Sequence, residues 1–209
     1  MAAPHPFYFT KKLNMNTQIL HDITFYSLYV AAAIVTYIIL ERSIFFAYTG
    51  RHARRLMEMT VDTNIDKLPA EELSQDKVAA NALREFLAAK PSLKTHIDVE
   101  DCVETVYITQ KYPLGRYLWL LDTIVTAAPL LGLLGTILGI IDTFAVLAQS
   151  GISDPAGVSK GIGTALQATA LGIGVALYGL LFFNSFNEKV ERINDMLKVL
   201  LLRAGMEHK

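Results

Sequence analysis

The sequence predicts an all-α membrane protein with three spans and long helices that extend into the cytoplasm. Two stretches carry no charged side chain: the 27 residues between Lys160 and Glu188 and the 19 residues between Asp122 and Asp142. A third apolar run, at 23–40, has 18 residues without a charge. A helix needs about 20 apolar residues to cross a bilayer. The hydrophobic content of 52% and the mean hydropathy of +0.34 fit three spans joined to a sizeable polar part.

The first apolar run is expected to be a retained span and not a secretory signal. It is longer than the apolar region of a signal peptide, and no A-x-A cleavage site follows it. The predicted segments are therefore a periplasmic N-terminal segment at 1–22, a first span at 23–41, a cytoplasmic helical region at 42–121, a second span at 122–148, a short periplasmic loop at 149–160, a third span at 161–186 and a cytoplasmic amphipathic tail at 187–209.

The distribution of Lys and Arg predicts the orientation. If residues 42–121 and the tail share one side, that side holds 16 of the 19 Lys and Arg residues. The positive-inside rule then places it in the cytoplasm and the N-terminus outside. The net charge of −1 gives no reason to expect nucleic-acid binding. Four arginines soon after the first span are expected to lie at the cytoplasmic edge of the membrane, near anionic lipids: Arg42, Arg51, Arg54 and Arg55.

The cytoplasmic region is predicted to be mostly amphipathic helix. Pro69 suits the first turn of a helix that Pro91 ends. The stretch Ile97–Gln110 has an apolar stripe at helical spacing, and Pro113 and Gly115 mark a break before the second span. The tail has its own apolar stripe, which needs either a partner helix or the membrane surface: Val190, Ile193, Leu197, Leu200 and Leu201.

A polar stripe runs along the second span. Asp122, Pro129, Thr136 and Thr143 are seven residues apart, so they lie close to one line that drifts by about 20° per step. An acid, a helix breaker and two hydroxyls are poorly suited to lipid, so the stripe is expected to face a water-containing centre or a partner helix. The alternative for each Thr is a hydrogen bond to its own backbone carbonyls. For Asp142 two interpretations remain open. It lies within the membrane and has a function, or it lies at the outer boundary of the span and is exposed to water.

Small residues recur along both late spans. Gly135 and Gly139 form a GxxxG pair, which permits close approach of helices, and Gly132 precedes them. In the third span, residues of the same kind recur every fourth position. These residues are Thr164, Ala168, Gly172 and Ala176. The two sets of small residues predict that both helices pack tightly against protein.

The sequence predicts neither an enzyme nor a cofactor. It contains no GxxxxGK[ST], HExxH, CxxC or GxSxG motif. The five histidines are scattered without metal-ligand spacing, so no metal site is expected. The single cysteine, Cys102, rules out a disulfide framework within the chain.

Parts of the two late spans resemble a known family. The segment Ala128–Thr136, followed by Gly139, Ile140 and Phe144, resembles the second-span signature of the ExbB/TolQ/MotA family. The segment Ile162–Asn184 looks like the third-span signature of that family. The predicted topology is similar to that of the ExbB/TolQ branch, whereas the MotA branch has four spans.

The resemblance implies a motor subunit that forms a homopentamer, with the second and third spans lining a central pore. Two single-span partner helices of the ExbD/TolR kind would lie inside, and an Asp on the partner would take up and release protons. By their positions, Thr136 and Thr169 match the pore-facing threonines of the family. The other candidate pore-lining residues are Thr143, Pro129, Asp122 and Thr164.

Three positions depart from the family pattern. Thr164 stands where ExbB and TolQ types usually carry Glu, so the role of that Glu does not transfer to this chain. Tyr178 replaces a usual Pro, and Asp122 replaces a small neutral residue. Asp122 is therefore expected to be an extra polar group at the cytoplasmic mouth of the pore.

The expected function is that of an ExbB-like proton-channel subunit. With an ExbD-like partner, it would convert proton motive force into mechanical work and energise TonB-dependent outer-membrane transport through a TonB-like protein. A TolQ-like subunit for envelope integrity shares the mechanism and is the near alternative. A passive membrane scaffold or channel is the third possibility.

Overall fold

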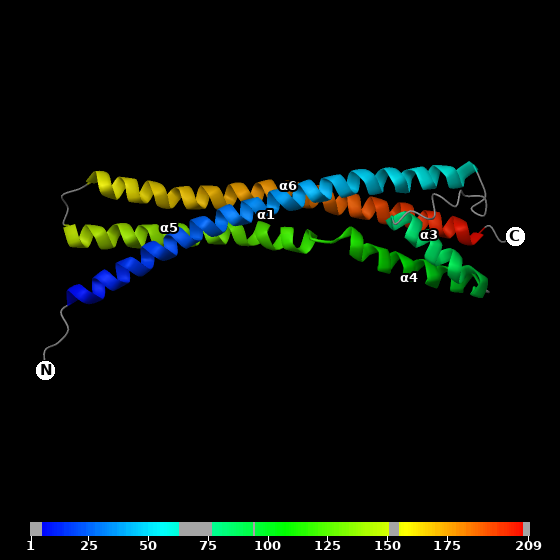
Figure 1. The fold of residues 1–209 in the computed structure, drawn as a ribbon, viewed down its shortest axis with the longest axis horizontal. Helices are drawn as coiled ribbons and strands as arrows, with labels where there is room; N and C mark the ends of the chain where they lie inside the picture. Colours follow the sequence, from blue (N-terminus) through cyan, green and yellow to red (C-terminus); the bar gives the residue numbers. More distant parts are fainter. Residues whose placement is uncertain (1–5, 63–76, 94, 151–154, 207–209) are drawn as a thin grey trace, which may run out of the picture. The chain divides into compact units, whose positions relative to one another are not determined.

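The structure, a computed structural model, describes residues 6–62, 77–93, 95–150 and 155–206 (Figure 1). All regular structure in these ranges is helical, which confirms the all-α prediction. The helices are α1 (Pro6–Asp62), α3 (Val78–Ala89), the short 3-10 helix η2 (Lys90–Ser92), α4 (His96–Leu114), α5 (Leu118–Ser150) and α6 (Pro155–Met206). Three of them contain stretches long and apolar enough to cross a membrane: Ile19–Thr60, Leu118–Ala148 and Pro155–Gly205.

The three long helices run past the ends of the spans that the sequence predicts. α1 is one continuous helix that includes part of the predicted N-terminal segment. α6 begins at Pro155, and a proline is favourable at the first position of a helix. Helix therefore occupies 149–150 and 155–160, which the sequence assigned to a loop.

The chain divides into two compact units. One comprises residues 1–39 and 120–182, and the other comprises residues 40–119 and 183–209. The first unit, called the membrane unit here, contains most of the charge-free sequence. The second contains the region that the sequence predicts to be cytoplasmic, and after that prediction it is called the cytoplasmic unit.

The cytoplasmic unit has a core built by α1, α3, α4 and α6. Its largest fully buried side chains include Phe86, Leu56 and Phe186. The apolar stripe of the tail is buried on helices of the same chain, which resolves the choice between a partner helix and the membrane surface. Phe186 packs on Phe46 of α1 at 5.5 Å between ring centroids, and Ile193 lies beside Gly50. All five predicted stripe residues are buried: Val190, Ile193, Leu197, Leu200 and Leu201.

The middle of the cytoplasmic unit begins later than the sequence suggests. Residue 69, where a helix was expected to start, lies outside the described residues, and α3 begins at Val78 after an extended Lys77. α4 starts with a reciprocal cap in which the Thr95 hydroxyl accepts from the Asp98 N–H at 3.1 Å and the Asp98 carboxylate accepts from the Thr95 N–H at 2.8 Å. Farther along α4, burial raises the pKa of the Cys102 thiol, and the negative charge of Glu85 raises it further. That thiol therefore stays protonated at neutral pH.

The predicted break before the second span is confirmed at Gly115, which caps α4, and α5 restarts at Leu118. Between them Tyr117 has φ of 65°, a left-handed conformation that is unfavourable for a bulky side chain. Arg42 of α1 lies over the Tyr117 ring at 5.4 Å and over the Phe45 ring at 4.4 Å. Its guanidinium also donates to Glu41 at 2.5 and 2.7 Å. Unlike the exposed Arg51, Arg54 and Arg55, Arg42 is only 2% exposed.

Arg42→Ala is expected to lower the stability of the cytoplasmic unit by about 2 kcal/mol, because it removes two cation–π contacts and leaves the Glu41 carboxylate unpaired. Thermal unfolding of the detergent-solubilised full chain, followed by circular dichroism, measures the change. The matched control is Arg54→Ala, since Arg54 is 76% exposed in its ion pair with Glu58 and such pairs contribute less than about 1 kcal/mol. Equal melting shifts for the two variants would contradict the role given to Arg42.

Candidate functional site

Two glycines bring the backbones of α5 and α6 into contact. A Cβ placed on Gly172 would lie 2.5 Å from the Ala128 carbonyl oxygen, and one on Gly132 would lie 2.8 Å from the Ala168 carbonyl oxygen. Such distances are closer than any real Cβ contact, so each position accepts only glycine without a shift of backbone. The pairing of 128 with 172 and of 132 with 168 shows that the helices run antiparallel. Close packing through small residues is typical of helices within membranes.

The remaining glycines of α5 extend this contact and add α1. A Cβ on Gly135 or Gly139 would lie 2.8 Å from the Cβ of Ala168 or Ala165, respectively. On the same two glycines, Thr24 and His21 of α1 also approach, at 3.8 and 3.1 Å from the added Cβ. Three helices therefore meet along one line of small residues. Ala176, which the sequence placed in the same packing set, is buried.

The hydroxyls of Thr136 and Thr169 meet in the middle of this contact. Thr136 Oγ1 and Thr169 Oγ1 are hydrogen-bonded to each other. Thr136 Oγ1 is also within donor distance of the Ala165 and Gly132 carbonyl oxygens, at 3.1 and 3.2 Å, and Thr169 Oγ1 lies 3.0 Å from the Gly132 oxygen. Both side chains are half-buried. The hydroxyls face each other across the helix pair. Thr136 also lies within hydrogen-bond distance of a backbone carbonyl one turn earlier in its own helix, which is the alternative that the sequence left open for this residue.

The hydroxyl pair has two hydrogen-bonding arrangements. Each hydroxyl has one proton to donate, so the two groups together have more acceptors within reach than protons. In one arrangement Thr136 donates to Thr169, which donates to the Gly132 carbonyl. In the other, Thr169 donates to Thr136, which donates to the Ala165 or the Gly132 carbonyl. Because the two differ only by rotation of hydroxyl protons, the pair can reverse its direction without moving a heavy atom.

The other members of the predicted polar stripe occupy different environments. Asp122 is exposed, and Pro129 is half-buried. Thr143 is buried, donates to the Gly139 carbonyl oxygen at 2.7 Å and touches Gly161 of α6. The structure therefore brings Thr136 and Thr169 together and leaves Asp122 and Thr143 apart from them on α5.

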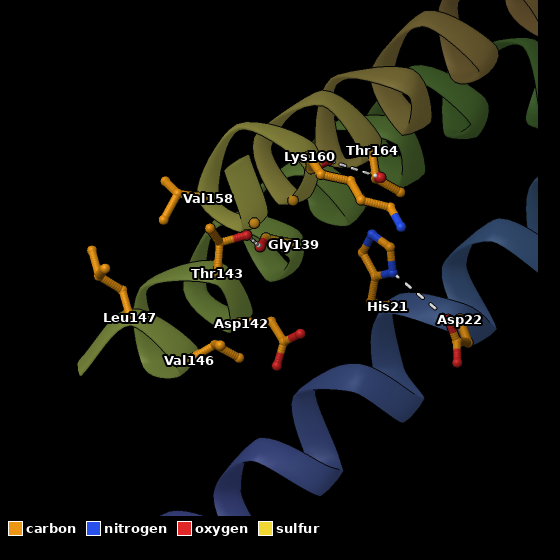
Figure 2. A pocket seen from close by; sticks show the side chains of 12 residues that line it. His21, Asp22, Gly139, Asp142, Thr143, Val146, Leu147, Val158, Lys160 and Thr164 are labelled. Atoms are coloured by element: carbon orange, nitrogen blue, oxygen red, sulfur yellow. Dashed lines mark hydrogen bonds and ion pairs between the residues drawn. The ribbon is translucent and has the colours of Figure 1, made fainter. Parts of the chain in front are cut away.

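A cavity of about 390 Å³ opens between the C-terminal part of α5, the N-terminal part of α6 and α1 (Figure 2). It is called the loop-end cavity here. Helix α1 contributes His21 and Asp22, α5 contributes Asp142 and Thr143, and α6 contributes Lys160 and Thr164, with the remaining wall formed by Gly139, Val146, Leu147, Gly157, Val158 and Gly161. The Thr164 hydroxyl donates to the Lys160 carbonyl oxygen at 3.0 Å.

The loop-end cavity contains residues that sequence reasoning missed. His21 and Asp22 were assigned only to the N-terminal segment, and Lys160 was used only as a loop charge. A usable signal was present, because His21 and Asp22 precede the first apolar run, Asp142 ends the second and Lys160 begins the third. When neighbouring spans run antiparallel, such ends meet on one side of the membrane. In the described ranges, no three His, Cys, Asp or Glu side chains are placed to hold a metal.

Comparison with known proteins gives a consistent result. The model of the MotA/TolQ/ExbB proton channel family matches residues 70–198. The biopolymer transport protein ExbB of Helicobacter pylori is 32% identical over 56% of this chain and 75% of its own length. The ExbB of Neisseria gonorrhoeae is 28% identical over 70% of this chain and 71% of its own length. The ExbB of Aquifex aeolicus is 39% identical over 39% of this chain. This chain matches only part of the length of three ExbB-type relatives, one of which is the protein of Aquifex aeolicus. The matched parts are 36%, 40% and 56% of the relatives' own lengths.

Proposed function

This chain belongs to the MotA/TolQ/ExbB proton channel family, and from that premise we propose that it is an ExbB-like motor subunit of the inner membrane. The observation that carries the proposal is the hydroxyl pair Thr136–Thr169, half-buried in stretches without a single charged side chain. A hydroxyl pair of this kind can solvate a carboxyl group in either protonation state. The ExbB names of the relatives favour the ExbB-like role over the TolQ-like role in envelope integrity.

The proposed assembly is a homopentamer whose α5 and α6 helices surround single-span helices of an ExbD/TolR-like partner. Placing an ionised carboxylate in the centre of a bilayer raises the free energy by at least about 2.5–3.5 kcal/mol. Hydroxyls lower that cost without trapping the charge, whereas a neighbouring Lys or Arg would hold the carboxylate ionised and stop its cycling. The absence of charge between Asp122 and Asp142 and between Lys160 and Glu188 supports such a cycle. Asp122, Pro129, Thr143 and Thr164 are proposed to line the same pathway.

Motion of the partner would pass to a TonB-like protein and energise transport across the outer membrane. In the proposed orientation the N-terminus is periplasmic and the C-terminus cytoplasmic, because the Lys and Arg residues favour the side of the cytoplasmic unit. The exposed Arg51, Arg54 and Arg55 would then lie near anionic lipid headgroups. The family argues against an enzymatic role.

The proposal predicts that the tagged chain co-purifies from membranes with a single-span protein whose span contains an Asp. Native mass spectrometry of the purified complex measures the subunit ratio, with five copies of this chain expected around the partner helices. Purification of this chain alone, from cells in which a partner of that kind is co-expressed at equal level, would favour a passive scaffold instead.

A further inference from the structure

The loop-end cavity combines titratable side chains of both signs within one space. His21 and Asp22 lie on α1, Asp142 lies on α5 and Lys160 lies on α6. Figure 2 shows the Lys160 side chain extending toward the His21 ring, with the Asp142 carboxylate on the opposite wall. A volume of about 390 Å³ with several polar groups on its walls is large enough to hold more than one water molecule.

His21 is placed to exchange a proton inside this cavity. Its side chain is 14% exposed, and its Nδ1 lies 3.8 Å from the Asp22 carboxylate. Its Nε2 is buried against Gly139 and has no hydrogen-bond partner among the described residues. The ring therefore has one nitrogen near a carboxylate and one nitrogen without a hydrogen-bond partner among the described residues.

The loop-end cavity lies between the same two helices as the hydroxyl pair. Thr143, on its wall, lies seven residues from Thr136, about 10 Å along the helix at 1.5 Å per residue. Thr164, also on its wall, is adjacent to Ala165, whose carbonyl oxygen lies 3.1 Å from the Thr136 hydroxyl. The cavity and Thr136 are therefore separated by about two turns of α5 within one subunit.

We propose that the loop-end cavity is the proton intake of each subunit, in which His21 and Asp142 exchange protons with the periplasmic side. This inference rests on the proposed function and adds the residues that load the proton. A hydronium ion in the cavity gives its proton to the Asp142 carboxylate or to the His21 ring and becomes water. The protonated group then gives that proton to water on the Thr143 and Thr164 side and returns to its original state. Asp22 and Asp142 attract the incoming positive charge, and Lys160 limits how many protons the cavity holds.

Water access is tested with one pair of cysteine variants in a Cys102→Ser background. Thr164 lines the cavity, whereas Leu166 is 57% exposed on the charge-free stretch of α6, which the proposed function places against lipid or a neighbouring subunit. In intact cells, a membrane-impermeant methanethiosulfonate is expected to label Thr164→Cys at least about tenfold faster than Leu166→Cys, since only the thiol in water forms thiolate readily. Labelling of Thr164→Cys that is no faster than labelling of Leu166→Cys would overturn the intake proposal, whatever the motor does.

Proton loading is tested by TonB-dependent uptake at different external pH values. His21→Gln combined with Asp142→Asn is expected to slow uptake about tenfold at an external pH of 8 and much less at pH 6, because abundant protons compensate for lost exchange groups. The exposed Asp101→Asn on α4 is the matched carboxylate control and should keep the unsubstituted profile. Thr136→Val reports separately on the motor and should be inactive at both pH values. If Thr136→Val is inactive and the double variant keeps the unsubstituted pH profile, the intake proposal is wrong and the motor proposal stands.

Discussion

Replacing Thr136 and Thr169 together by valine is expected to abolish proton-driven uptake. Valine keeps the branched shape of threonine, so the close packing of α5 on α6 is retained while both hydroxyls are lost. The hydrogen bonds that link Thr136, Thr169, Gly132 and Ala165 then cannot form. A partner carboxylate beside them would lose its solvation, which raises the cost of ionising it by at least about 2 kcal/mol. That cost corresponds to a roughly thirtyfold slower cycle at each step that needs the ionised form.

Two further variants separate the loss of hydroxyls from a general effect of substitution. Thr136→Ser with Thr169→Ser keeps both hydroxyls and should retain most of the uptake. Thr126→Val, on the exposed face of α5, removes a hydroxyl whose hydrogen bonds in the described part of the chain go to the carbonyl oxygens of Asp122 and Thr123, and it should leave uptake unchanged. Uptake at the unsubstituted rate in the double valine variant would remove the hydroxyl pair from the mechanism.

Gly172→Val is expected to disrupt the α5–α6 pair and with it the membrane unit. The first added carbon alone would lie 2.5 Å from the Ala128 carbonyl oxygen and 3.0 Å from Gly132 Cα, and both are backbone atoms that cannot rotate away. Overpacking of this kind costs about 3 kcal/mol, and the helices must separate to relieve it. Separation would also pull Thr169 away from Thr136, so the loss of stability and the loss of uptake are expected together.

The matched control is Gly174→Val, on the same helix and two residues away. A Cβ there has no neighbour within 4 Å, so the single chain has room for the side chain. Thermal unfolding in detergent should show a large drop in melting temperature for Gly172→Val and a small change for Gly174→Val. A melting temperature of Gly172→Val equal to that of the unsubstituted chain would mean that α5 and α6 do not approach as closely as described.

Much of the fold follows from local features of the sequence. The charge-free lengths predict the three long helices, and Pro155 and Gly115 mark a helix start and a helix end. The spacing of the tail stripe predicts which of its side chains are buried. Each of these features depends on residues within a few helical turns of one another, so it can be predicted from the sequence without knowing how the helices pack.

Other features depend on which helix lies beside which. Periodicity places Thr136 on a face of α5, but only the packing of α6 reveals that Thr169 meets it. Arg42 was expected at the lipid edge with its three neighbours, and its burial arises from the turn at Tyr117, 75 residues later in the chain. The loop-end cavity combines the ends of three helices that the sequence presents separately. No local pattern carries this information.

Proton flux through the assembled complex tests the central claim most directly. The chain and its single-span partner are reconstituted together into lipid vesicles that contain a pH-sensitive dye, and an imposed membrane potential drives protons inward. We expect acidification with the unsubstituted chain and none above the lipid background when Thr136 and Thr169 are both valine. Equal flux through the unsubstituted and the double valine complexes would contradict the account.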